Sequence, residues 1–235
     1  MNDELLGFGS AIKSLYPENC DEICKFAQSV LSKASTVQAT FDENEFPQFA
    51  GKLYAIGESG ANNTQLRWGK LDLFLQSNPS GKLAGQVCYK IGGGFFLNKH
   101  EFRIVEIGQH RFIFLRWDKD GKTTRIFWNG KQVAVVNKLA GFGIALFGGS
   151  VQVQKPDSDV LFTIGFRCAL LMLFGKLQIG CGGNEKIIFS SSWPNPGGLP
   201  EKTISDLASV PFEKQILIIA TLLWMSWRAL DKQNQ

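Results

Sequence analysis

The segment QILIIATLLWMSWRAL, Gln215–Leu230, is the most apolar stretch of this 235-residue chain. Its uncharged part extends from Gln215 to Trp227 and is bounded by Lys214 and Arg228. A helix rises about 1.5 Å per residue and the hydrocarbon core of a bilayer is roughly 30 Å thick, so a membrane span needs about 20 apolar residues. The segment is shorter than that, and a run of this length is more typical of a helix buried in a protein core.

The apolar residues cover every side of this expected helix, which has no polar face: Ile216, Leu217, Ile218, Ile219, Leu222, Leu223, Trp224, Met225 and Trp227. A helix that is apolar all round must be enclosed on all sides. We therefore expect an enclosed helix, and the alternative is a short tail anchor or a membrane-dipping helix. The helix is expected to begin near Thr203–Ser205, to break around Pro211 and to continue to about Asp231.

The middle of the chain, from about residue 51 to 192, consists of short apolar runs separated by turns. We expect strands at KLYAIG, WGKLDLFLQ, GQVCYKI, EFRIVEI, HRFIFLRWD, TRIFWNG, KQVAVVNK, KLQIGCG and KIIFSS, and one or two core strands in Val160–Gly175. The turns between strands are expected at 78–81, 119–122 and 128–131, where Asn-Gly and Asp-Gly tolerate the positive φ of tight hairpins.

These strands arrive every 8–12 residues with no helix between them, which favours an antiparallel barrel or sandwich over a parallel sheet. The expected fold class is mainly β with few helices. A closed antiparallel barrel around the hydrophobic C-terminal helix is the arrangement that encloses an all-round apolar helix. Residues 51–235 are expected to form this domain.

Residues 1–50 differ from the rest, because eight acidic and three basic residues give them a net charge of −5. The stretch CDEICKFAQSVLSKAS carries apolar residues at helical spacing, and Asp21 and Glu22 stand in its first turn, where acidic side chains are favourable. We expect an acidic N-terminal extension with one amphipathic helix, followed by a linker ending near Pro47. The helix either docks on the domain or binds a protein partner.

Bulk properties narrow the class of protein. The formal charge of +4 is only mildly basic, so nucleic-acid binding is not expected. Five scattered cysteines do not fit a secreted disulfide framework, and Cys20-x3-Cys24 has no second pair to complete a zinc site. The N-terminus MNDELLGFGS does not read as a signal peptide. We expect a cytoplasmic protein, either free or peripheral to a membrane, with no metal or other cofactor.

Two stretches resemble the tubby C-terminal-like superfamily, which includes tubby proteins, phospholipid scramblases and LURP-one-related proteins. FEKQILIIATLLWMSW, Phe212–Trp227, resembles the final helix of the family, and TRIFWNGKQVAVVNK, Thr124–Lys138, resembles its repeated hairpin. The resemblance covers about residues 51–232. It implies a barrel of about 12 strands around the central helix and a phospholipid scramblase-like role at membranes.

The chain also departs from that family. Scramblases carry a run of alternating acidic residues before the helix, thought to bind calcium, whereas PEKTISDLASVPFEK holds only Glu201, Asp206 and Glu213. This spacing does not supply the clustered oxygen ligands that calcium prefers. The Pro-rich N-terminal region, the palmitoylated cysteine cluster and the phosphoinositide motif of tubby proteins are not recognisable either. The departures argue against calcium-dependent scrambling.

The sequence gives little sign of catalysis. The two histidines, His100 and His110, do not form HExxH, and no nucleophile elbow, Walker A motif or dinucleotide-binding motif occurs. Cys88 or Cys168 would act as a nucleophile only if the fold joined it to a histidine. We therefore expect a non-enzymatic binding module.

The positive signal is a basic block between Asn98 and Lys138, in which nine basic and four acidic residues give a net charge of +5. Each basic residue near an acidic leaflet adds about 1 kcal/mol of membrane affinity. The candidate residues for binding anionic phospholipid are at or beside the expected turns: Lys119, Lys122, Lys131, Arg116 and Arg125. The plainer interpretation is a solvated surface that carries charge.

A second resemblance points elsewhere. His110–Val133, HRFIFLRWDKDGKTTRIFWNGKQV, is similar to paired strands of laminin-G and concanavalin-like β-sandwiches, in which Trp-Asp precedes an Asn-Gly-Lys turn. It implies carbohydrate binding, with Trp117 or Trp128 stacking on a sugar. Such domains have no use for a wholly apolar C-terminal helix, so the lipid-binding hypothesis is preferred.

Overall fold

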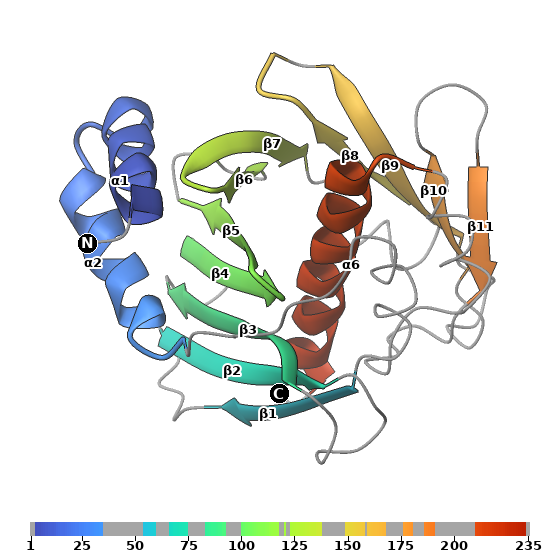
Figure 1. Ribbon diagram of the computed structural model, residues 1–235, viewed down its shortest axis with the longest axis horizontal. Helices are drawn as coiled ribbons and strands as arrows, with labels where there is room; N and C mark the ends of the chain where they lie inside the picture. Colours follow the sequence, from blue (N-terminus) through green and yellow to red (C-terminus); the bar gives the residue numbers. More distant parts are fainter. Residues whose placement is uncertain are drawn as a thin grey trace.

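One curved antiparallel sheet dominates the computed structural model (Figure 1). The structure describes residues 3–34, 54–59, 66–74, 83–92, 100–117, 120, 123–137, 149–157, 159–167, 176–180, 186–190 and 210–233. The helices are α1 (Asp3–Leu15), α2 (Cys20–Leu31) and α6 (Phe212–Gln233). The strands are β1 (Tyr54–Ser59), β2 (Leu66–Phe74), β3 (Leu83–Gly92), β4 (His100–Ile107), β5 (His110–Arg116), β6 (Thr123–Trp128), β7 (Lys131–Asn137), β8 (Gly149–Gln154), β9 (Val160–Arg167), β10 (Lys176–Gly180) and β11 (Lys186–Ser190).

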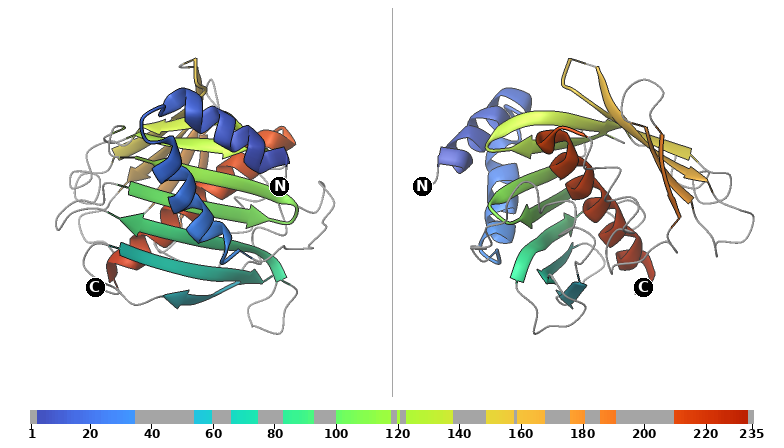
Figure 2. Two further views of the ribbon diagram at one scale, coloured as in Figure 1. Left: turned by 90° about the vertical axis from the view of Figure 1, so that its left-hand side faces the viewer. Right: turned by 45° about the vertical axis from the view of Figure 1, so that its right-hand side comes forward.

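The sheet bends around α6, and the helices α1 and α2 lie on its opposite, outer face (Figures 1 and 2). Its strands follow one another in chain order from β1 to β11, and each pairs antiparallel with the next. The expected mainly β fold with a C-terminal helix is confirmed. The expected closed barrel is wrong, because no pairing among the described strands joins β1 to β11. The helix is about 10 Å across with its side chains, and it separates the two walls of the sheet (Figure 1).

The turn between β6 and β7 forms as the Asn-Gly pair predicts. Asn129 and Gly130 have φ of 51° and 74°, the pair of positive values that a type I′ turn requires. The turn between β4 and β5 was not expected; there Gly108 alone has positive φ, 58°, as in type II′. The expected turn at 78–81 lies outside the described residues, and of 119–122 only Asp120 is described.

The inner core consists of α6 and the concave face of the sheet. Residues 215–222 and Trp224 are buried on every side of the helix, which confirms the enclosed helix for this segment. They pack on alternate residues of the strands, among them Val105, Phe112, Phe114 and Ile126. α6 begins directly after Pro211; the start expected near Thr203–Ser205 lies outside the described residues. None of the helices that the structure describes combines the length and the hydropathy needed to cross a bilayer.

A second core joins α1 and α2 to the outer face of the sheet. The buried face of α2 comprises Ile23, Ala27 and Val30, and it packs with Phe102, Ile104 and Ile113 of the strands. The amphipathic helix is therefore docked, and the apolar face that a protein partner would need is already covered. Because α6 covers the other face, β4 and most of β5 are buried on both sides.

Helix α1 and strand β8 were not expected from the sequence. Two glycines in LLGFGS lower the helix propensity of α1, but Phe8 and Ile12 anchor it in the outer core. Gly7 is useful there, since a Cβ at this position would lie 3.3 Å from Cα of Gly130. The start of α1 thus approaches the β6–β7 turn closely.

Ala220→Arg is expected to prevent folding. Ala220 is fully buried in the inner core, and an unpaired charge buried there costs several kcal/mol, comparable to the whole free energy of unfolding. Glu213→Arg, at an exposed position in the first turn of the same helix, is the control and should cost no more than about 1 kcal/mol, the unfavourable effect of a cation at a helix N-terminus. Cooperative unfolding of Ala220→Arg near the wild-type temperature would contradict the enclosure of α6.

Candidate functional site

The concave face has a polar end, formed by Glu101, Arg103 and Arg116 together with Trp224 of α6. Arg103 Nε donates to Glu101 Oε1 at 2.7 Å, Arg116 Nη2 lies 3.2 Å from Oε2, and Trp224 Nε1 donates to Oε1 at 3.2 Å. Neighbouring strands place these groups together, because Glu101 and Arg116 are paired across β4 and β5. The indole of Trp224 also stacks on Phe114, so the cluster fixes the position of α6 against the sheet.

This cluster corrects the prediction for Arg116. The side chain was expected to contact lipid head groups, but Arg116 is 5% exposed, Glu101 is 1% exposed and Arg103 is fully buried. Strand alternation explains the difference: Arg116 lies on the same face as Phe114, which faces α6. Arg116 forms an ion pair with Glu101 inside the protein, so it is not a candidate for binding lipid at the surface.

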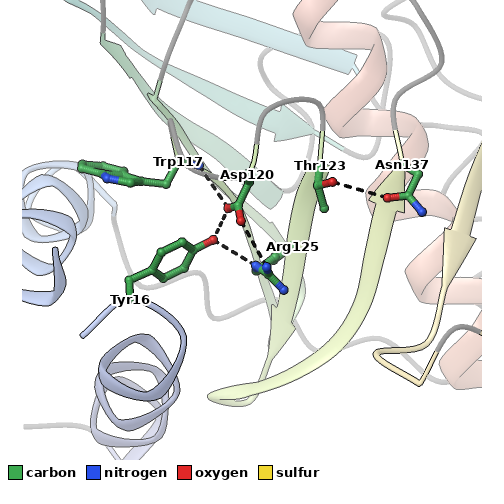
Figure 3. Close-up of polar contacts among 6 residues, drawn as sticks. All are labelled: Tyr16, Trp117, Asp120, Thr123, Arg125 and Asn137. Carbon is green, nitrogen blue, oxygen red and sulfur yellow. Dashed lines mark hydrogen bonds and ion pairs between the residues drawn. The ribbon is translucent and has the colours of Figure 1, made fainter. Parts of the chain in front are cut away.

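Arg125 belongs to a different network, which ties α1 to the base of the β5–β6 turn (Figure 3). The hydroxyl of Tyr16 donates to Asp120 Oδ2, Arg125 Nε donates to the Tyr16 hydroxyl at 2.9 Å, and Arg125 Nη2 donates to Asp120 Oδ1 at 3.1 Å. Burial, followed by the hydrogen bond to Asp120, raises the pKa of Tyr16. Arg125 is thus an internal anchor with a partly exposed side chain.

Trp117 lies beside this network and is also internal. It is 3% exposed, stacks on His100 at 3.8 Å between ring centroids and meets Phe26 of α2 edge to face. A sugar cannot stack on a tryptophan whose two neighbours are an imidazole and a helix side chain of the same protein. Trp117 therefore does not fit the glycan-stacking role that the sandwich resemblance implied.

Of the three candidate lysines, the structure describes Lys131 alone. Lys131 follows the turn at the end of β6, whereas Lys119 and Lys122 precede β6 in sequence. Six strand residues at about 3.3 Å each separate the two ends by roughly 20 Å. Lys131 is exposed, and the side chains of Lys119 and Lys122 lie outside the described residues. Lys131 is therefore the candidate lysine whose surroundings the structure defines.

An aromatic cluster lies beside Lys131, at the end of the strands where β6 turns into β7. We call His110, Trp128, Lys131 and Phe212 the aromatic end. The ring of His110 lies 5.6 Å from that of Trp128 and 5.4 Å from that of Phe212, and all three side chains are partly exposed. Trp128 additionally stacks on Phe112 at 5.0 Å.

Helices α1 and α6 both begin close to the aromatic end, because Gly7 packs on Gly130 and Phe212 contacts His110. Figure 2 (left) shows the two helices beginning on the same side of the sheet. Lys214 stands in the first turn of α6, and Leu6, 51% exposed, precedes the glycine of α1 that packs on Gly130. The combination of partly exposed aromatics, exposed aliphatic surface and lysines was missed by sequence reasoning. Phe212 is 84 residues away from Trp128, so only the fold brings them together.

The structure offers no thiol nucleophile among the described residues. Burial raises the pKa of Cys88 to about 12, and its Sγ contacts Gln86 Oε1 at 3.8 Å instead of a histidine. Burial, and then the neighbouring Cys20, raise the pKa of Cys24 to about 11. Among the described residues, no three His, Cys, Asp or Glu side chains lie close enough together to hold a metal ion jointly.

Comparison with known proteins adds no relative: no family model, no curated protein and no solved structure matches the chain. The arguments about function therefore rest on the residues themselves.

Tyr16→Phe is expected to lower the free energy of unfolding by about 1.5–3 kcal/mol at pH 7, because hydrogen bonds to two charged groups are lost. The raised pKa of Tyr16 sets the pH dependence: above about pH 10 the unfolded chain loses this proton while the folded protein keeps it, so wild-type stability falls. Denaturant titration should therefore show a smaller difference between wild type and variant at pH 11 than at pH 7.

The control for this network is Thr123→Val. The hydroxyl of Thr123 lies 3.5 Å from Oδ1 of Asn137 at the exposed surface, and its loss should change stability by less than about 0.5 kcal/mol (Figure 3). A difference between wild type and Tyr16→Phe that grows above pH 10 would contradict the assignment.

Glu101→Gln should destabilise the protein by about 3–5 kcal/mol, because two buried guanidinium groups lose the carboxylate they share. Asp159→Asn is the matched control, since the ion pair of Asp159 with Lys155 spans 3.8 Å at the surface and contributes at most about 1 kcal/mol. Equal losses in urea denaturation of the two variants would show that the cluster does not hold α6 in place.

Proposed function

We propose that the chain is a non-enzymatic binding module that attaches to anionic phospholipid at a membrane surface through the aromatic end. The observation that carries the proposal is the position of Trp128, Phe212 and His110 next to an exposed lysine. Tryptophan at membrane–water interfaces has its ring at the level of the head groups. Lysine beside it adds attraction to acidic lipids.

The charges at this end support an anionic ligand. Lys131 and Lys214 both lie there, and the first turn of α6 contributes the partial positive charge of a helix N-terminus. Glu213, exposed in the same turn, is the opposing charge among the described side chains of α6. Because the lysines and the aromatic rings act on different parts of a lipid surface, their contributions should respond differently to salt.

The resemblance to phospholipid scramblases supports the same ligand class, and it remains a resemblance. The carbohydrate-binding alternative is reduced to Trp128, since Trp117 is enclosed. One face of Trp128 is stacked on Phe112, so a sugar could meet only the other face. The phospholipid proposal therefore takes precedence, and glycan binding is an outcome that the experiment can distinguish.

The test compares two double variants of equal net charge, Lys131→Ala with Lys214→Ala and Lys119→Ala with Lys122→Ala. Co-sedimentation with liposomes containing phosphatidylserine should show that the first variant loses about 2 kcal/mol of affinity, about 30-fold, at low salt. The second variant should bind like the wild type. Salt at 0.1 M screens exposed charges over about 10 Å, so the difference between the variants should shrink as salt is added.

The outcomes separate the alternatives. Equal losses by both variants would indicate attraction by net charge alone, and a larger loss by Lys119→Ala with Lys122→Ala would move the surface to the β5–β6 turn. Wild-type protein that does not sediment with acidic liposomes but binds a glycan array through Trp128 would replace the proposal with the carbohydrate-binding alternative.

A further inference from the structure

The first two turns of α2 carry a pair of cysteines that the proposed function does not use. Cys20 is the first residue of the helix and Cys24 is one turn further along, so both side chains lie on one side of it. Both are half-buried beside the outer core, and neither is in a disulfide.

Helix geometry decides what this pair can do. Cβ atoms at positions i and i+4 of a helix are about 5–6 Å apart, whereas a disulfide needs about 3.5–4.5 Å between them. The intact helix therefore holds the two sulfur atoms too far apart for a direct bond between them. A metal ion between the sulfur atoms adds two metal–sulfur bonds to the bridge, and the longer bridge spans the distance that the helix sets.

We propose that Cys20 and Cys24 form a two-thiolate site for a soft monovalent cation, with Cu(I) as the ion that such ligands select. Thiolate ligands are soft and favour Cu(I) among the metals found in proteins. Zinc instead requires four ligands in a structural site or three and a water in a catalytic one. Two sulfur ligands without a third donor satisfy a linear two-coordinate ion.

The surroundings of the pair suit such an ion. The half-buried position limits the access of water while leaving one side open for the metal to enter. Asn19, the residue before the helix, makes no side-chain cap hydrogen bond, so the first turn can adjust the position of Cys20 at little cost. On binding, each thiol loses its proton to solvent and each sulfur forms a bond to the metal, with no change in oxidation state.

Competition with a chromogenic Cu(I) chelator such as bicinchoninate, under anaerobic and reducing conditions, tests the site. The wild-type chain should remove one equivalent of Cu(I) more than Cys20→Ser or Cys24→Ser removes. Serine is close in size to cysteine at these half-buried positions, and circular dichroism checks that each variant is folded. Cu(I) should also raise the melting temperature of the wild type and not that of the serine variants, because a ligand that binds only the native state stabilises it.

Cys168→Ser with Cys181→Ser is the control, because it removes two thiols elsewhere and should retain the full equivalent of Cu(I). X-ray absorption of the wild-type complex should show two sulfur neighbours. The proposal is overturned if the wild type does not compete with the chelator, or if the equivalent of Cu(I) persists in Cys20→Ser and Cys24→Ser and is lost in the control variant.

Discussion

The enclosure of α6 is the constraint on which the rest of this fold depends. A helix with buried residues on every side needs cover on every side, and the sheet supplies much of it by bending around the helix. The walls in turn must be apolar on their inner face, as Val105, Phe112 and Ile126 are. Where the inner face is polar, at Glu101, the indole N–H of Trp224 on the helix donates a hydrogen bond to it. The helix and the concave face are therefore matched along their length, apolar to apolar and donor to acceptor.

The outer helices extend this constraint to the second face of the sheet. Strand β4 has Phe102 and Ile104 on the side of α1 and α2, and Val105 and Ile107 on the side of α6. Its two glutamates are consequently internal, and Glu106 and Glu101 pair with Arg111 and Arg116 of the neighbouring strand. Among the described residues of the basic block, Arg103 and Arg116 are buried, Arg111 and Arg125 are partly buried in ion pairs, and Lys131 is exposed beside a turn.

Local patterns predicted the parts of this structure that depend on local physics. The uncharged run between Lys214 and Arg228 indicated an enclosed helix, and Asn129-Gly130 indicated a tight turn, since each depends on a few adjacent residues. Helix α1 was not predicted because its glycines lower the local helix propensity. The helix forms because Phe8 and Ile12 pack in the outer core. The open sheet and the burial of Arg116 could not be predicted from the sequence. Both depend on how the strands pack around α6, which involves residues far apart in the chain, such as Arg116 and Trp224.

Helix α6 follows all the described strands in the chain, and this order matters for how the protein folds during synthesis. All eleven described strands are synthesised before α6, so Phe112, Phe114 and their neighbours have no partner on the concave face until the last helix follows. Of the described helices, α1 and α2 precede the sheet in the chain, and they cover its outer face. If the sheet forms before α6 is synthesised, its concave face is an open apolar trough. Contacts between segments this distant in sequence also make folding slow.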